Sequence, residues 1–125
     1  MAAYTLKNLM ETKDDAAEHG MGETLAAHFP REQLGCEQLG FSLQRLKPGK
    51  DLPFGHTHEQ AEEVYVVLSG SGRVKLDDEV AALRPMDALR VSPGVMRTFA
   101  AGPDGLEYLV FSTHYEGDSN IHPQP

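Results

Sequence analysis

The chain is poor in cysteine, in basic side chains and in long apolar runs, and each shortage excludes a class of protein. Cys36 is the single cysteine among 125 residues, so no disulfide can form within the chain. Lys and Arg number 11 against 19 Asp and Glu, a net charge of -8. This balance argues against nucleic acid or an anionic membrane as the main partner, because both need a basic surface. Uninterrupted apolar runs such as residues 64–68 are far too short to span a membrane.

The start of the chain lacks the basic and apolar regions of a signal peptide. We therefore expect a soluble, cytoplasmic protein. A chain of this length is most simply one domain that buries its own core.

Short strand-like stretches separated by Gly and Pro turns dominate the chain from residue 36 onward. Such spacing favours an all-β sandwich, jelly roll or barrel. Ahead of them, the sequence predicts one helical turn and one short strand. We expect an irregular or helical N-terminal segment at 1–35, a β-domain at 36–114 and a loose polar C-terminal tail at 115–125. The predicted strands cover 25–29, 36–46, 63–68, 72–76, 80–83, 88–91, 95–100 and 106–112, and the helical turn covers 14–20.

Two histidines two residues apart, His56 and His58, precede Glu63 and a β-branched, aromatic strand. Side chains alternate along an extended chain, so both histidines lie on one face. Two histidines and a carboxylate suit a divalent metal that keeps open coordination positions. Fe, Zn, Mn and Ni all fit such ligands, so the residues predict a metal site without fixing the metal.

The spacing around these residues resembles the first motif of the cupin family. Gly49 leads to His56 and His58, four residues then lead to Glu63, and six more lead to Gly70. This spacing selects Glu63 rather than its neighbour as the matching carboxylate. The resemblance implies a cupin double-stranded β-helix, a jelly-roll barrel, with metal-ligand roles for both histidines and Glu63.

The second cupin motif resembles residues 84–99, with two departures. Met86 stands where glycine is usual, and Arg97 stands where the family places a fourth ligand, a histidine. A guanidinium has no lone pair to give to a metal. At about 4 Å it would repel a divalent ion by roughly 8 kcal/mol at an effective dielectric of about 20.

Three arrangements of Arg97 remain open. It turns aside and leaves a metal on two histidines and Glu63; it replaces the metal and pairs with Glu63; or it lies farther off and clamps an anionic ligand that also reaches the metal. Tyr65 lies two residues after Glu63, and Phe99 lies two residues after Arg97, so each should point to the same side of its strand as the earlier residue. Gln44 lies on a neighbouring predicted strand. We take Arg97, Tyr65, Phe99 and Gln44 as candidate ligand-binding residues, although core packing explains the two aromatic residues equally well.

Strand parity also predicts an apolar outer face. If Glu63 points inward, then Val64, Val66 and Leu68 point outward. Another sheet, the N-terminal segment or a second subunit must cover them, and a homodimer is one expectation.

These features predict a small cupin that binds a divalent metal and a small ligand, which Arg97 would favour as an anion. If the protein is an enzyme, a metal-dependent dioxygenase or isomerase type is compatible with the family. The alternative is a metal-free barrel that binds a small molecule without catalysis.

Overall fold

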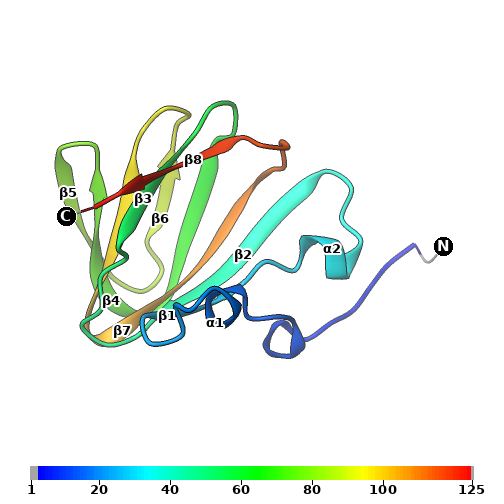
Figure 1. Cartoon of the computed structure of the whole chain (residues 1–125), viewed down its shortest axis with the longest axis horizontal. Coiled ribbons are helices and arrows are strands. Elements are labelled where there is room, and N and C mark those ends of the chain that lie inside the picture. The colour runs from blue at the N-terminus through cyan, green and yellow to red at the C-terminus, as the bar shows by residue number, and fades with distance from the viewer. Residues whose placement is uncertain (1–2, 125) are drawn as a thin grey trace.

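Antiparallel strands make up most of the protein, as the alternating sequence predicts. The structure is a computed structural model that describes residues 3–124. Its eight strands form one sheet that curls into a half-barrel (Figure 1). The all-β prediction is confirmed. Met1, Ala2 and Pro125, which end the two predicted terminal segments, lie outside the described residues. The elements are η1 (Leu9–Glu11), α1 (Asp15–Glu18), β1 (Leu25–His28), α2 (Arg31–Leu34), β2 (Leu39–Leu46), β3 (Phe54–His58), β4 (Glu63–Leu76), β5 (Glu79–Leu83), β6 (Ala88–Val91), β7 (Arg97–Thr113) and β8 (Ser119–Pro123).

Two long strands, β4 and β7, pair with each other, and most of the remaining strands pair with one of them. The sheet order is β1-β2-β7-β3-β8, while β4 pairs with β7 and also with β5 and β6. The sequence predicted two shorter strands in place of β4 and two in place of β7, and this prediction is wrong. The glycines near residue 70 do not end β4, because pairing with β7 resumes after two register shifts. Gly70 has φ +82°, and a Cβ there would collide with the carbonyl of Gly105. Glycine at this position therefore lets the two backbones cross closely.

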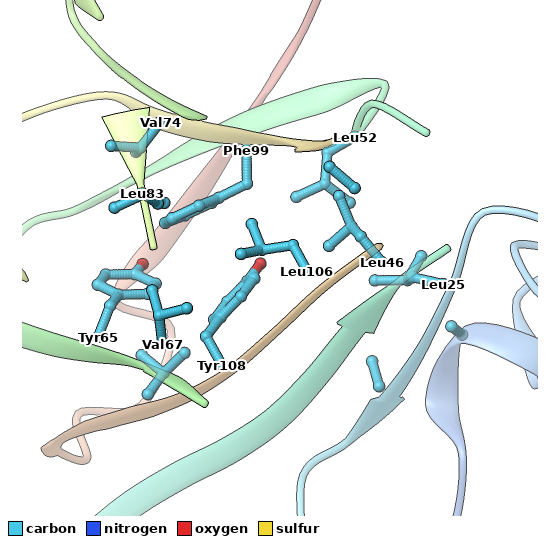
Figure 2. Close-up of a cluster of buried hydrophobic side chains, with 14 of the residues drawn as sticks. Leu25, Leu46, Leu52, Tyr65, Val67, Val74, Leu83, Phe99, Leu106 and Tyr108 are labelled. Carbon is cyan, nitrogen blue, oxygen red and sulfur yellow. The ribbon is translucent and has the colours of Figure 1, made fainter. Parts of the chain in front are cut away.

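The barrel core is aromatic and aliphatic. Tyr65 and Val67 on β4 are buried and face inward, whereas Leu68 is 40% exposed, so the predicted strand parity is confirmed. Phe99 lies between two tyrosines, with ring centroids 4.9 Å from Tyr65 and 4.7 Å from Tyr108 (Figure 2). These rings pack together in the buried core, which we call the apolar floor of the barrel.

The N-terminal segment packs beside β1 and β2 (Figure 1). The predicted helical turn is present as α1, because the Asp14 carboxylate caps it by accepting from the Ala16 backbone N–H at 3.0 Å. The same carboxylate oxygen accepts from the backbone of Ala27 on β1, also at 3.0 Å. One side chain therefore joins the helical turn to the sheet.

The C-terminal segment differs from its prediction. Residues 119–123 form β8, which pairs antiparallel with β3 along the whole length of that strand. The expectation of a loose tail at 115–125 is therefore wrong over this stretch. All five side chains of β8 are exposed, so it has none of the apolar alternation that reveals a strand in sequence.

Over residues 3–124, none of the helices combines the length and the apolar character needed to cross a membrane.

Candidate metal centre

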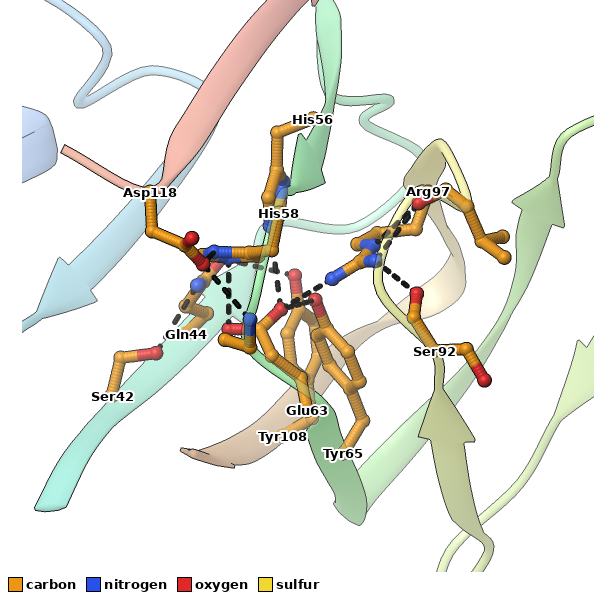
Figure 3. A network of polar contacts seen from close by, with 12 residues as sticks. Ser42, Gln44, His56, His58, Glu63, Tyr65, Ser92, Arg97, Tyr108 and Asp118 are labelled. Carbon is orange, nitrogen blue, oxygen red and sulfur yellow. Dashed lines mark hydrogen bonds and ion pairs between the residues drawn. The ribbon is translucent and has the colours of Figure 1, made fainter. Parts of the chain in front are cut away.

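The three predicted ligands converge at one end of the barrel. His56 and His58 project from the same face of β3, and Glu63 is the first residue of β4 (Figure 3). One candidate donor atom from each lies within 4.8 Å of the other two. His56 Nε2 is 3.4 Å from Glu63 Oε1, and His58 Nε2 is 3.2 Å from Glu63 Oε2. Two donors that share an ion at about 2.1 Å lie about 3.0–3.4 Å apart in octahedral to tetrahedral geometry, so the donor set fits one divalent ion.

Glu63 is buried but ionised. Burial opposes its charge, yet hydrogen bonds from His56, His58 and the Tyr65 hydroxyl outweigh burial and hold the pKa of Glu63 well below its usual range. The Tyr65 hydroxyl donates to Glu63 Oε1 at 2.6 Å. Its own pKa is raised well above the ordinary value by burial and by the charge of Glu63, so it stays a donor. Glu63 therefore favours its carboxylate form, which is the form that binds a cation.

His58 carries a proton more readily than an ordinary histidine. Its hydrogen bond to Glu63 is the largest cause of a raised pKa, and Asp118 adds to it. Its two ring nitrogens lie between the carboxylates of Glu63 and Asp118, which both favour the protonated ring. A bound divalent ion would replace that proton, since a metal needs the neutral ring.

Arg97, the first residue of β7, pairs with Glu63. Its side chain is fully buried, and Nη1 donates to Glu63 Oε1 at 2.8 Å. Nε and Nη2 donate to the carbonyl of Val95 at 3.2 and 2.8 Å, and Nη2 also donates to the carbonyl of Ser92 at 3.2 Å. The guanidinium is therefore anchored at the fourth-ligand position and does not turn aside.

The two oxygens of Glu63 have different surroundings. Oε1 receives Arg97, Tyr65 and His56, while Oε2 faces His58 (Figure 3). Among the described residues, Arg97 donates to Oε1 and makes no hydrogen bond to Oε2. The negative charge of Glu63 would offset part of the repulsion between Arg97 and an ion held by the three ligands.

Asp118 belongs to the centre and was missed in the sequence. Its carboxylate Oδ2 accepts from His58 Nδ1 at 3.0 Å, although it comes from the segment predicted as a tail. Burial opposes its ionisation, but backbone hydrogen bonds from Ala61 and Gln60, with that of His58, lower its pKa. Nothing in the sequence separates Asp118 from Glu116, which is exposed and bonds to His114 at 3.0 Å outside the cluster.

The other predicted ligand-binding residues have packing or hydrogen-bonding partners of their own. Phe99 is buried in the aromatic stack. Gln44 accepts from the Tyr108 hydroxyl at 3.0 Å and donates to Ser42 at 3.2 Å. Tyr65 contacts the centre directly through Glu63. Ligand binding by these residues and by Arg97 stays a prediction.

Comparison with known proteins identifies the family. A model of the cupin domain matches residues 42–112, more than half of the chain. The chain belongs to the cupin family. A search among curated proteins gave no match.

Solved structures agree on the cupin fold. This cupin is similar to a cupin protein from Bacteroides fragilis, with 24% identity and a TM-score of 0.74 over 94% of this chain and 89% of that one. It is also similar to the polyketide cyclase RemF from Streptomyces resistomycificus, with 17% identity and a TM-score of 0.76 over 95% and 84% of the two chains. A putative sugar phosphate isomerase from Acidithiobacillus ferrooxidans shares 20% identity, with a TM-score of 0.66 over 82% and 78%. At these identities the likeness establishes the double-stranded β-helix alone.

Proposed function

We propose that this cupin binds one divalent metal ion through His56, His58 and Glu63 and acts through it on a small molecule. The observation that carries the proposal is the spacing of the donors: 3.4 and 3.2 Å from the two histidine nitrogens to the oxygens of one ionised glutamate. The identity of the metal among Fe, Zn, Mn and Ni is left open by this donor set.

The open side of the centre lies beside His56, whose side chain is the most exposed of the three. Three protein ligands leave positions for water or a ligand oxygen. When bound, the metal would supply Lewis-acid chemistry or activate water or dioxygen. Both a dioxygenase and an isomerase type of reaction remain compatible with such a centre.

Charge favours an anionic ligand. A divalent ion and Arg97 together bring three positive charges, against one negative charge each from Glu63 and Asp118. The surplus attracts a carboxylate or phosphate in a partly desolvated site. Arg97 contributes mainly through its charge, because all but one of its N–H groups are bonded to other described residues.

Elemental analysis of protein purified without a chelator tests the metal proposal. We expect about one ion per chain in the wild type, loss of the ion in His56→Ala and its retention in His114→Ala, which removes a histidine outside the cluster. Substoichiometric metal that is unchanged by His56→Ala would contradict the proposal.

The second candidate function is a metal-free binding barrel, favoured by the 2.8 Å pair between Arg97 and Glu63. In this alternative the guanidinium supplies the positive charge that a metal would otherwise bring. Glu63 is then a poor general base near neutral pH because its pKa is so low. Tight binding of a small anion by chelator-treated protein, undiminished relative to the metal-loaded form, would favour it.

We further propose that two copies of the chain form a dimer through the outer face of β2, β7 and β4. Phe41 and Phe111 stack there with centroids 6.3 Å apart, and Phe111 is 43% exposed. Leu39 and Leu68 extend this apolar surface at 64% and 40% exposure. Light scattering should give twice the chain mass, and a stable monomer would contradict the dimer. A cytoplasmic location also stays part of the proposal, and cell fractionation would check it.

A further inference from the structure

The connection between the two metal-ligand strands is held by Asp118. Its Oδ1 accepts from the backbone N–H of Gln60 at 2.8 Å, and Oδ2 accepts from that of Ala61 at 3.0 Å. The backbone carbonyl of Asp118 accepts from Glu59 N at 3.0 Å. The three donors, Glu59, Gln60 and Ala61, lie in the turn between His58 and Glu63. One residue of the C-terminal segment therefore holds the turn that separates the ligands.

The C-terminal segment also pairs, through β8, with one edge of β3, the strand that carries His56 and His58. β8 pairs with β3 from Phe54 to His58, whereas β7, on the other edge of β3, pairs with it only through His56 and Arg97. The backbone that carries both histidines therefore depends on β8 for most of its ladder.

The side-chain contact selects how His58 presents its ring. An ionised carboxylate can only accept a hydrogen bond, so the Nδ1 of His58 that faces Asp118 at 3.0 Å carries the proton. Nε2 points at Glu63 Oε2, 3.2 Å away, and is the nitrogen at which an ion would replace a proton. A carboxylate behind a ligand histidine orients the ring in this way in metal sites generally.

We propose that Asp118 is a positioning residue of the metal centre, which holds the His58 ring with Nε2 directed at the ion and links the C-terminal segment to metal affinity. The effect on affinity rests on the proposed metal-binding function. The orientation of the ring does not, because the contact with Asp118 is present without an ion.

The test compares Asp118→Asn with Glu116→Gln, a matched change at an exposed carboxylate of the same segment. Asparagine removes the negative charge and replaces one carboxylate oxygen by an NH₂ group that cannot accept, so at least one of the hydrogen bonds from Gln60, Ala61 and His58 is lost and any that remains to His58 is weaker. Each protein is titrated with Co²⁺ by absorption spectroscopy. In chelator-treated protein, the ring N–H of His58 is assigned by long-range ¹H–¹⁵N correlation. The hydrogen bond to a buried carboxylate should slow its exchange with water and make the Nδ1 proton visible.

We expect Asp118→Asn to weaken Co²⁺ binding by about 10–100-fold and to speed the exchange of the Nδ1 proton with water, because its acceptor is no longer charged. Glu116→Gln should change neither. Unchanged Co²⁺ affinity together with an unchanged Nδ1 proton in Asp118→Asn would overturn the proposal. If the variant does not fold, the wild type decides alone, because absence of a protected Nδ1 proton on His58 contradicts the contact. If the wild type binds no Co²⁺, the proposed function fails, while the ring proton still tests the positioning role.

Discussion

Over the first five residues of β4, the inward face passes from a polar end at Glu63 to an apolar end at Val67, and these two ends have different roles. Glu63 begins the strand among two histidines and an arginine, whereas Val67, four residues later on the same face, is buried among apolar side chains. Tyr65 stands between them, with its hydroxyl on Glu63 and its ring 4.9 Å from that of Phe99. One strand therefore supplies both a polar mouth and an apolar floor, and Tyr65 contacts both.

The largest effect is expected from Glu63→Gln, at the polar end. This change removes a metal ligand and leaves the fully buried charge of Arg97 without its partner. We expect loss of measurable metal binding and a fall of about 3 kcal/mol in the free energy of unfolding, because breaking a buried ion pair leaves one charge uncompensated. Urea unfolding in chelator and a Co²⁺ titration measure the two effects.

Two further variants sharpen this result. Glu62→Gln is the matched control, since its exposed neighbour Arg90 lies 3.5 Å away at the surface, and it should leave both quantities unchanged. The double variant Glu63→Gln, Arg97→Met should recover much of the lost stability but not the metal. A double variant as unstable as the single one would show that the ion pair is not the source of the loss.

Leu106→Ala tests the apolar end. Leu106 is buried in the core, and its truncation should cost about 2–3 kcal/mol of unfolding free energy through lost contacts and the cavity left behind. The metal affinity of the folded protein should stay within twofold of the wild type. The same unfolding and Co²⁺ measurements apply, and a tenfold fall in affinity would show that the two ends of the barrel are not separable.

A change of pH should act on the polar end in two opposite directions. The raised pKa of His58 means that its proton stabilises the folded apoprotein fully below the unfolded value of about 6.5. This stability is lost as pH rises through the folded pKa. Metal binding needs the neutral ring, so affinity should fall about tenfold per unit below that pKa. Thermal unfolding of the apoprotein, relative to His58→Gln, and metal titrations across pH 5–9 check both trends; parallel trends would contradict them.

The smallest effect is expected at Met86, whose backbone N–H donates to the carbonyl of Val67 at 2.9 Å but whose side chain faces solvent. Its φ of 75° lies in the left-handed region, and its side chain is almost wholly exposed. Replacement by glycine should raise the free energy of unfolding by about 0.5–1 kcal/mol, as relief of backbone strain exceeds the added entropy of the unfolded chain. Urea unfolding measures it, with no change expected in metal affinity. A destabilised variant would mean that the side chain makes a contact that offsets the strain.

The polar mouth could be predicted from sequence only in part. His56, His58 and Glu63 were found because their spacing is local and repeats a family motif. The position of Arg97 was also apparent, but its anchoring on the carbonyls of Ser92 and Val95 depends on how one turn folds back. Asp118 was missed because it reaches the centre through pairing of two strands that are distant in sequence.

The apolar floor was easier to predict, since an inward-pointing Glu63 determines by strand parity which residues of β4 face the core. The boundaries of the strands were harder to predict from the sequence. Glycine-rich stretches such as the one at Gly70 resemble turns in sequence, yet pairing with β7 carries the strand across it. The polar, exposed β8 gave no signal at all, because the backbone ladder that forms it does not depend on which side chains it carries.

X-ray absorption spectroscopy of the zinc-loaded protein counts the imidazole ligands of the metal. We predict two imidazoles with oxygen ligands in the wild type, and three imidazoles in Arg97→His, which places a histidine at the fourth-ligand position. Zinc binding in that variant should be at least about tenfold tighter, because a like charge is removed. A wild-type centre with three imidazoles or none, or an Arg97→His centre unchanged from the wild type, would contradict a metal centre built on His56, His58 and Glu63.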